Sequence, residues 1–172
     1  GNPLVIDDVL WEGGENGYLV GIQLHRDYDL SGLVKVRPEL LVAIRGWNAD
    51  LIDKVGDRNV SIESSVAAFG ERIYFANSAG RVVGLDISRV NEGLAPVVFD
   101  FWMGDDVDAS LVIDDEGMLY VAAELERYLP RADEIGQLVK LDPYRKGDPL
   151  VWSLGVPPGL TDWKGGIWST PA

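Results

Sequence analysis

The stretch "RIYFANSAGRVVGLDI", from Arg72 to Ile87, contains an apolar run, a short turn that ends at Gly80, and a second run in which side chains alternate. Alternation with a period of two is typical of a β-strand. Glycine adopts the positive φ that a tight hairpin requires. The stretch therefore predicts two antiparallel strands joined by a short turn.

Two other stretches share this pattern. They are "VLWEGGENGYLVGIQL", from Val9 to Leu24, and "MLYVAAELERYLPRADEIGQLVKLDP", from Met118 to Pro143, whose middle is longer. The string "LVIDD" also occurs twice, at Leu4–Asp8 and at Leu111–Asp115, shortly before two of the hairpins. Because the surrounding pattern recurs together with the string, the chain is predicted to contain internal repeats.

Each hairpin is predicted to have one strand before it and one after it. The following strands begin near Pro38, Pro96 and Pro149, and proline is tolerated where a strand starts. The preceding strands are "NPLVIDD", "SIESSVAAFG" and "VDASLVIDD", and "GIWSTPA" fits the same position. The sequence thus predicts units of four antiparallel strands. Their ranges are about 1–46, 60–104 and 107–156, with the start of a fourth unit at 165–172.

Four-stranded units in series predict an all-β fold, a partial β-propeller of about three blades. A helix is an alternative only for "PELLVAIRGWNADLIDKV", from Pro38 to Val55. Propellers close with about four to eight blades, and three would leave two apolar faces in water. We therefore expect either that the chain is a fragment of a longer protein or that it forms a homo-oligomer that closes the propeller.

The composition excludes several functions. The formal net charge of −13 disfavours nucleic acid and anionic lipid as partners. No apolar run is long enough to span a membrane. The sequence has no cysteine, which excludes disulfides and thiolate catalysis within it.

The repeats resemble the pyrroloquinoline-quinone-like propeller repeats of the quinoprotein dehydrogenase superfamily. "SSVAAFGERIYFANSAGRVVGLDI", from Ser64 to Ile87, matches that pattern nearly throughout, and "VWSL" at 151–154 carries its usual tryptophan. The first copy departs from it at Gln23 and Leu24. The resemblance implies a propeller in the periplasm or outside the cell. Because the superfamily includes dehydrogenases, outer-membrane assembly scaffolds and binding proteins, it leaves the function open.

Long loops are predicted to gather on one face of the propeller. Successive strands run antiparallel, so the hairpin within each unit and the connection to the next unit lie at the same end. Long loops on a rigid scaffold often carry binding residues, and exposed tryptophan and arginine are favoured at interfaces. The candidates for a ligand or partner face are Trp47, Arg127, Tyr128, Arg131, Trp163 and Lys164.

A second candidate site lies where the innermost strands begin. The strings "ESS", "DAS" and "WST" align, which gives Glu63, Asp108 and Trp168 equivalent positions. In the quinone enzymes that the repeats resemble, side chains at such positions surround the cofactor, with a tryptophan beneath it and a carboxylate near calcium. The resemblance implies that these three residues bind a cofactor. A polar channel lining that holds water is the alternative.

"DYDLSG", from Asp27 to Gly32, is similar to the first half of a calcium loop, in which Asp27, Asp29 and Ser31 would supply oxygens. An ordinary acidic turn explains the same residues. His25, the single histidine, has no evident nucleophile beside it, so no catalytic residue is predicted.

The first expectation is a non-catalytic binding or interaction scaffold without a cofactor. Its partner would be an unidentified protein or small molecule, and its parent a larger exported bacterial protein. The alternative is a segment of a dehydrogenase that uses pyrroloquinoline quinone and calcium. There the cofactor would perform the redox chemistry, and the protein would orient it.

Overall fold

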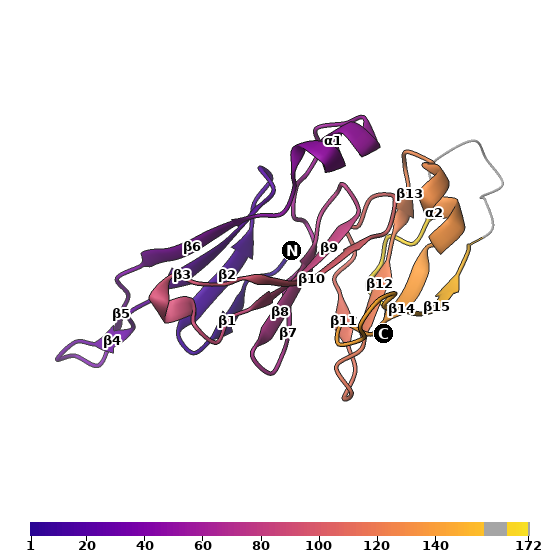
Figure 1. Cartoon of the computed structure of the whole chain (residues 1–172). Helices are drawn as coiled ribbons and strands as arrows, with labels where there is room; N and C mark the ends of the chain where they lie inside the picture. The colour runs from indigo at the N-terminus through magenta and orange to yellow at the C-terminus, as the bar shows by residue number, and fades with distance from the viewer. Residues whose placement is uncertain (157–164, 172) are drawn as a thin grey trace.

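A computed structural model describes residues 1–156 and 165–171 of the chain. Two of the candidate binding residues, Trp163 and Lys164, lie outside the described residues. Among the described residues, three four-stranded antiparallel sheets follow one another along the molecule, and two α-helices lie at the same end of the sheets (Figure 1).

Each of the three sheets has four strands. The first contains, in spatial order, β1 (Leu4–Ile6), β2 (Val9–Gly13), β3 (Tyr18–Gln23) and β6 (Glu39–Arg45). The second contains β7 (Ala67–Phe69), β8 (Arg72–Ala76), β9 (Arg81–Asp86) and β10 (Val97–Trp102). The third contains β11 (Val112–Ile113), β12 (Leu119–Ala122), β14 (Leu138–Leu141) and β15 (Leu150–Leu154).

Two small two-stranded sheets complete the described β-structure. Strands β4 (Asp27–Tyr28) and β5 (Val34–Lys35) form a hairpin between β3 and β6. Strand β13 (Glu124–Leu125) pairs with β16 (Gly165–Gly166). The fold is therefore all-β and propeller-like, and each four-stranded sheet is built from one continuous stretch of the chain, with β4 and β5 inserted in the first and β13 in the third.

The core lies between neighbouring sheets rather than inside any one of them. The sheets are stacked face to face, so side chains that alternate along a strand pack in turn against different neighbours. The first interface buries Val9, Trp11 and Leu19 against Ile73, Phe75, Val83 and Leu85. The second buries Tyr74, Val82 and Phe101 against Leu119, Val121 and Val139.

Glycines bring the aromatic rings of the first two sheets close to the backbone. Trp11 and Tyr74 are fully buried, and each lies opposite a glycine of the next strand, Gly21 and Gly84. A Cβ on Gly84 would lie 2.6 Å from Cε1 of Tyr74, so a larger residue does not fit there. Each ring can occupy its position only because the residue opposite it on the neighbouring strand is a glycine without a side chain.

The third sheet departs from this arrangement. Lys140 takes the place of the glycine opposite Tyr120. Its ammonium group lies 3.0 Å from a carboxylate oxygen of Asp114 and 5.0 Å from the centre of the Tyr120 ring. Hydrogen bonds from Lys140 and Tyr120 hold the pKa of Asp114 down to about 2. The outer face of the third sheet thus carries a paired charge beside its aromatic side chains.

Hydroxyl groups connect the inner ends of the successive units. The backbone N–H of Asn2 donates to Oγ of Ser65, that of Ser65 to Oγ of Ser110, and that of Ser110 to Oγ1 of Thr170. Each hydroxyl therefore accepts from the equivalent residue of the unit before it. This ladder fixes the register between units and gives Glu63, Asp108 and Trp168 equivalent positions, as the alignment predicts.

The two "LVIDD" strings lie one residue out of structural register. Leu4 pairs with Trp11, whereas the residue that pairs with the equivalent Tyr120 is Val112 rather than Leu111. A one-residue shift moves a side chain to the opposite face of a sheet. The units do repeat, but the identical strings are not structurally equivalent.

Short helices lie in the connections between strands, and α1 (Ala49–Val55) falls within the segment for which a helix was the alternative. Helix α1 lies in the connection between the first two units. Helix α2 (Pro130–Ile135) lies in the long middle of the third unit, and the short 3-10 helix η1 (Val90–Glu92) lies between β9 and β10. The helix alternative for Pro38–Val55 is wrong for β6 and right for α1. Helix α1 begins after Asn48, whose side chain accepts from the N–H of Leu51, and ends at Gly56 with φ of 67°. Seven residues are too few for a periodic pattern to show.

We predict that Gly21→Ala destabilises the fold by about 1–3 kcal/mol, because overpacking a filled core costs that much. The new Cβ would lie 2.9 Å from Cζ3 of Trp11 and 2.9 Å from Cγ2 of Val42. Urea denaturation of the purified variant measures the change.

Gly155→Ala is the matched control, because the nearest described atom to its Cβ would be Oε1 of Gln137 at 4.0 Å. A less flexible unfolded chain would make this control neutral or slightly stabilising. Equal midpoints for the two variants would contradict the packing described for Trp11.

Candidate functional site

The end of the sheets at which α1 and α2 lie is called the helix-bearing face. Helix α1 and two tryptophans, Trp47 and Trp102, lie at its centre. Leu51 and Val55 of the helix are buried in a small apolar cluster that Trp47 and Trp102 border. The indole N–H of Trp47 donates to the carbonyl oxygen of Asn16 at 3.0 Å, and that of Trp102 to the carbonyl oxygen of Ala79 at 3.0 Å. Both acceptors directly precede the turn glycines of their hairpins, so each indole is fixed to one hairpin.

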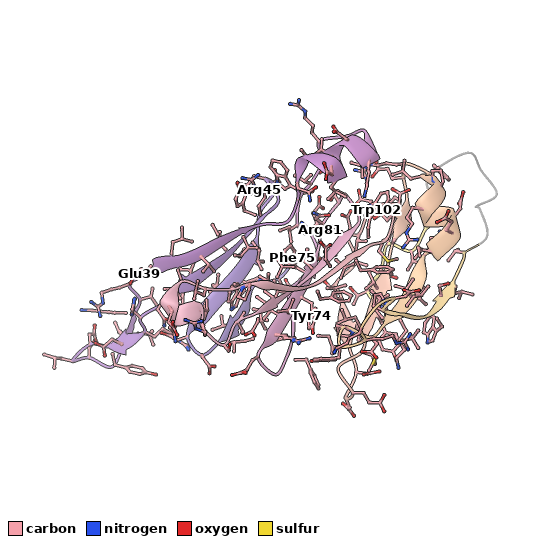
Figure 2. All side chains as sticks on the ribbon, in the orientation of Figure 1. Glu39, Arg45, Tyr74, Phe75, Arg81 and Trp102 are labelled. Carbon is pink, nitrogen blue, oxygen red and sulfur yellow. The ribbon has the colours of Figure 1, made fainter. Side chains whose placement is uncertain are left out.

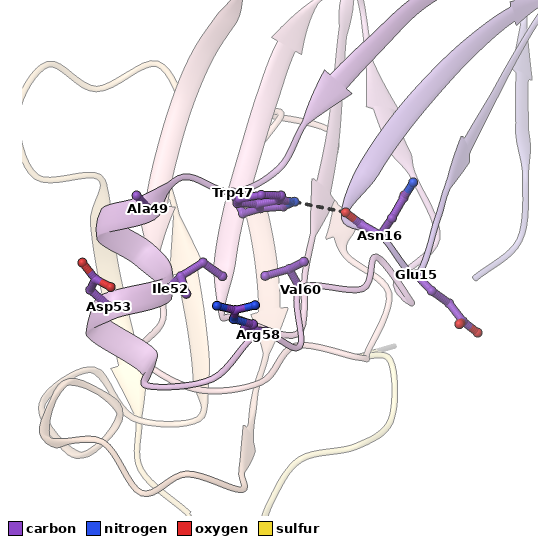
Figure 3. A pocket seen from close by; sticks show the side chains of 8 residues that line it. All are labelled: Glu15, Asn16, Trp47, Ala49, Ile52, Asp53, Arg58 and Val60. Carbon is purple, nitrogen blue, oxygen red and sulfur yellow. Dashed lines mark hydrogen bonds between the residues drawn. The ribbon is translucent and has the colours of Figure 1, made fainter.

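A pocket of about 520 Å³ opens beside Trp47, between the first hairpin and α1 (Figure 3). Its size is in the range of small-ligand sites. Its wall comes from the first hairpin, from α1 and from the segments on either side of α1. The lining residues are Glu15, Asn16, Trp47, Ala49, Ile52, Asp53, Arg58 and Val60.

The Trp47 ring is held in place before any ligand arrives. Besides the hydrogen bond to Asn16, its Cδ1 lies against Gly17, where a Cβ would approach to 2.5 Å. Gly17 has a φ of 72°, so the tight turn and this close approach both call for glycine. The guanidinium of Arg45 lies 5.0 Å from the ring centre, and Arg45 does not line the pocket.

Figure 2 shows Arg45 at the end of β6 nearest α1, and Glu39 at the opposite end of the same strand. The strand therefore brings its last residue to the helix-bearing face. Within this face, Arg81 also connects the units. It pairs with Asp100 through two nitrogens, at 2.9 and 2.7 Å, and donates to the carbonyl oxygen of Gly46.

The charged groups of the pocket are not neutralised by neighbours. Among the described residues, the side chains of Glu15, Asp53 and Arg58 make no hydrogen bond or ion pair, and all three residues are exposed. Two carboxylates and one guanidinium therefore surround an apolar wall formed by Trp47 and Ile52.

A second group of charged residues lies between the second and third sheets. The Arg127 side chain is only 10% exposed and lies 3.0 Å from Asp57, 3.6 Å from Asp105 and 3.5 Å from Asp106. It also donates to the carbonyl oxygen of Ser78 at 2.7 Å. Arg127 thus fixes the chain after α1 to the third unit, and it is not presented on an exposed binding face.

Asp105 organises the loop that carries Arg127. Its side chain is fully buried and accepts from the backbone N–H groups of Glu126, Arg127 and Tyr128 at 2.9–3.1 Å. Several backbone N–H groups thus satisfy a carboxyl group that would be costly to bury without partners. The loop is therefore wrapped around one buried side chain.

Asp106 has a different environment. Its side chain is 3% exposed, and its Oδ1 atom has no hydrogen-bond partner among the described residues. Burial raises the pKa of Asp106 to about 7, the negative charge of Asp108 adds to the rise, and Arg127 opposes it. Near neutral pH this carboxyl group is therefore partly protonated.

The structure connects two of the three predicted cofactor residues through serines. Ser61 donates to Glu63 at 2.8 Å, Ser78 donates to Asp108 at 3.4 Å, and the two hydroxyls are 2.9 Å apart. Trp168 is 60% exposed and donates to the carbonyl oxygen of Gly165. None of the three lines the pocket beside Trp47, and cofactor binding by these residues stays a prediction.

Two other candidate binding residues have partners of their own. Tyr128 is 50% exposed and has a φ of 53°, a conformation held by the bond from its N–H to Asp105. The Arg131 guanidinium lies 3.5 Å from Glu134 and 5.8 Å from the ring centre of Phe101. Both lie at the α2 side of the helix-bearing face, away from the Trp47 pocket.

The predicted calcium residues lie in a turn in which the aspartate side chains accept hydrogen bonds from nearby groups of the same turn. Asp29 accepts from the hydroxyl of Ser31 and from the N–H groups of Ser31 and Leu33, which lower its pKa. Asp27 accepts from the N–H of Tyr28. No group of three or more His, Cys, Asp or Glu side chains in the described parts of the chain is placed to hold a metal ion. Calcium binding at this turn stays a prediction.

His25 lies beside a carboxylate rather than a nucleophile. Its Nε2 is 2.9 Å from Oε2 of Glu39, and both side chains are exposed. His25 lies between β3 and β4, and Glu39 is the first residue of β6, so the pair lies where the β4–β5 hairpin joins the first sheet.

Sequence reasoning identified Trp47 but missed the seven other described residues that line its pocket: Glu15, Asn16, Ala49, Ile52, Asp53, Arg58 and Val60. The "NG" pair at Asn16 and Gly17 predicts a turn, yet nothing in that pattern shows what the turn contacts. The missed residues come together because α1 returns the chain to the first hairpin. A helix start at Asn48 and stop at Gly56 was the available signal.

No family model matches the chain, and its sequence matches no curated protein. Among solved structures, the chain is similar to the crystal structure of BamB from Moraxella catarrhalis, with 14% identity and a TM-score of 0.44. The match covers 70% of this chain and 32% of BamB, so the chain spans about a third of that protein.

We predict that Asp106 lowers stability as the pH rises from about 4 to 7. Its pKa is about 7 in the folded chain, against 3.8 without these neighbours, so the folded state binds the extra proton in this interval. Stability falls with pH wherever the folded state holds more protons. The pKa values of six other carboxyl groups are lowered, so their contributions to stability change with pH in the opposite direction; these are Asp8, Asp29, Asp57, Asp86, Glu92 and Asp114.

Thermal melts of the wild type and Asp106→Asn between about pH 5 and 8 test this. The variant should lose less stability over the interval and exceed the wild type at the upper end. Asp115→Asn, at an exposed position, changes the net charge equally and should follow the wild type. Parallel curves for the wild type and Asp106→Asn would contradict the assignment.

Proposed function

We propose that the chain is a non-catalytic binding scaffold, part of a β-propeller, and that the pocket beside Trp47 is its binding site. The observation that carries the proposal is the fixed Trp47 ring beside three charged side chains that have no partner among the described residues. A rigid aromatic anchor next to available polar groups is typical of recognition sites.

The scaffold proposal includes a parent protein that is exported. Its support is the resemblance of the repeats, which implies the periplasm or the extracellular space. No helix in the described part of the chain has both the length and the apolar character that a membrane span requires.

The alternative function is a segment of a dehydrogenase that uses pyrroloquinoline quinone and calcium. Glu63, Asp108 and Trp168 would then have to bind the quinone, although the serine contacts of the two carboxylates do not favour this. Adding quinone and calcium to the purified protein tests it, because a bound quinone gives a visible absorbance band and supports dye reduction.

The outer face of the first sheet supports a further part of the proposal, that copies of the chain associate. Val5, Leu10, Ile22 and Leu40 lie in one row across that face, and Val5 and Leu40 are 44% and 61% exposed. The equivalent residues of the second sheet, Ile73 and Leu85 among them, are buried against the first sheet. We propose that a sheet of a second copy covers the row in the same way.

Ile22→Lys should shift the purified chain towards monomer, because lysine would place a charge at the centre of that row. Sedimentation equilibrium at several dilutions measures the mass. The matched control is Val151→Lys, an exposed position of β15 in the third sheet. A wild-type monomer at every concentration would contradict the association.

The binding function predicts that small ring compounds perturb Trp47 more than the other tryptophans. The chain has six tryptophans, so nitrogen-15 spectra of the labelled protein contain six indole signals, and Trp47→Ala identifies one of them. A mixture of neutral, anionic and cationic ring compounds should shift that signal selectively. Equal shifts at all six, or none at Trp47, would contradict a site at this pocket.

A further inference from the structure

One face of the Trp47 ring is available to a ligand. Arg45 lies over the ring without lining the pocket, while Ile52 and Val60 line the pocket beside the ring. Figure 3 shows Trp47 and Arg58 across the pocket from each other, with Ile52 and Val60 on the two sides between them. The space is therefore bounded by an indole, a guanidinium and two aliphatic side chains.

These four groups favour a flat aromatic ring. An aromatic ring gains from contact with an indole, and a guanidinium is attracted to the face of an aromatic ring. The Trp47 ring is already held by Asn16 and Gly17, so binding orders little of the protein. A purely aliphatic ligand would fill the same space without the contribution from Arg58.

The charges around the pocket favour a cation beside that ring. Glu15 and Asp53 outnumber Arg58, and the whole chain carries a formal charge of −13. Neither carboxylate is neutralised by a described neighbour. A basic group next to the aromatic ring can pair with Glu15 or Asp53 while the ring lies against Trp47.

The exposure of the lining favours a peptide over an enclosed small molecule. Five of the eight lining residues, Glu15, Asn16, Ala49, Asp53 and Arg58, are exposed, so the pocket is open along one side. A side chain presented by a larger partner leaves its backbone on that open side. We propose that the pocket binds an aromatic side chain of a protein segment that carries a basic residue next to it. This inference rests on the proposed binding function of the same pocket.

Three capped tripeptides test the inference by titration into the nitrogen-15-labelled chain. Lysine–tyrosine–lysine carries both features, lysine–leucine–lysine lacks the ring, and glutamate–tyrosine–glutamate reverses the charge. The first should shift the Trp47 indole signal with an affinity at least about tenfold above that of either other peptide. Raising the salt should weaken it, because the pairing with Glu15 and Asp53 is screened.

Variants separate the two contributions. Because Trp47→Ala lacks the Trp47 indole signal, binding to the variants is measured by titration calorimetry. Trp47→Ala should abolish binding of the lysine–tyrosine–lysine peptide, whereas Trp152→Ala, in β15 of the third sheet, should leave it unchanged. Glu15→Gln combined with Asp53→Asn should weaken binding about fivefold and reduce its salt dependence. The five remaining indole signals show whether the Trp47→Ala protein is folded.

The outcomes distinguish this inference from the binding function itself. Equal affinity for the three peptides, or tightest binding of the glutamate peptide, would overturn the inference. If ring compounds shift Trp47 but the lysine–tyrosine–lysine peptide does not, the binding function stands and the inference fails. If neither shifts Trp47, both fail.

Discussion

Packing between neighbouring sheets is the contact on which the described structure depends. A four-stranded sheet with apolar side chains on both faces can remove them from water only against other sheets. Trp11 and Tyr74 show how close this packing is, because each buried ring lies over a glycine of the adjacent strand. The inner hydroxyl ladder through Ser65 and Ser110 holds the sheets in the register that this packing requires.

The stacking also explains where the pocket lies. Sheets placed face to face direct their turns to the two ends, and the hairpin turns meet the connections between units at one of them. At this end α1 fills the space between Trp47 and Trp102, whose indoles are fixed to hairpin carbonyls. A rigid scaffold therefore holds short, irregular segments in fixed positions, which is a common basis for binding sites.

Charged groups on the helix-bearing face fall into two kinds with different consequences. Asp105 and Arg127 are buried and make several polar contacts each, so their charges are used within the fold. Glu15 and Arg58 are exposed and make no contact of this kind with the described residues. The first kind holds the loops together at the junction of the second and third sheets, and the second kind is available to a partner.

The sequence by itself determined the repeating unit. Glycine at the hairpin turns, alternation along the strands and the aligned "ESS", "DAS" and "WST" strings all act locally or recur at each unit, so they predict the four-stranded sheets and the equivalence of Glu63 with Asp108. Trp47 could be named in advance because a tryptophan in a long loop is itself a signal.

Tertiary structure decided the faces, the short helices and the contacts. The two "LVIDD" strings differ in register because the pairing partner, rather than the string, fixes which side of a sheet a residue occupies. Arg127 became buried because Asp57, Asp105 and Asp106 converge on it from distant parts of the chain. The pocket requires Asn16 and Val60 to lie close together. Local patterns cannot specify a contact between residues so far apart in the sequence, because the contact forms only when the sheets and α1 pack together.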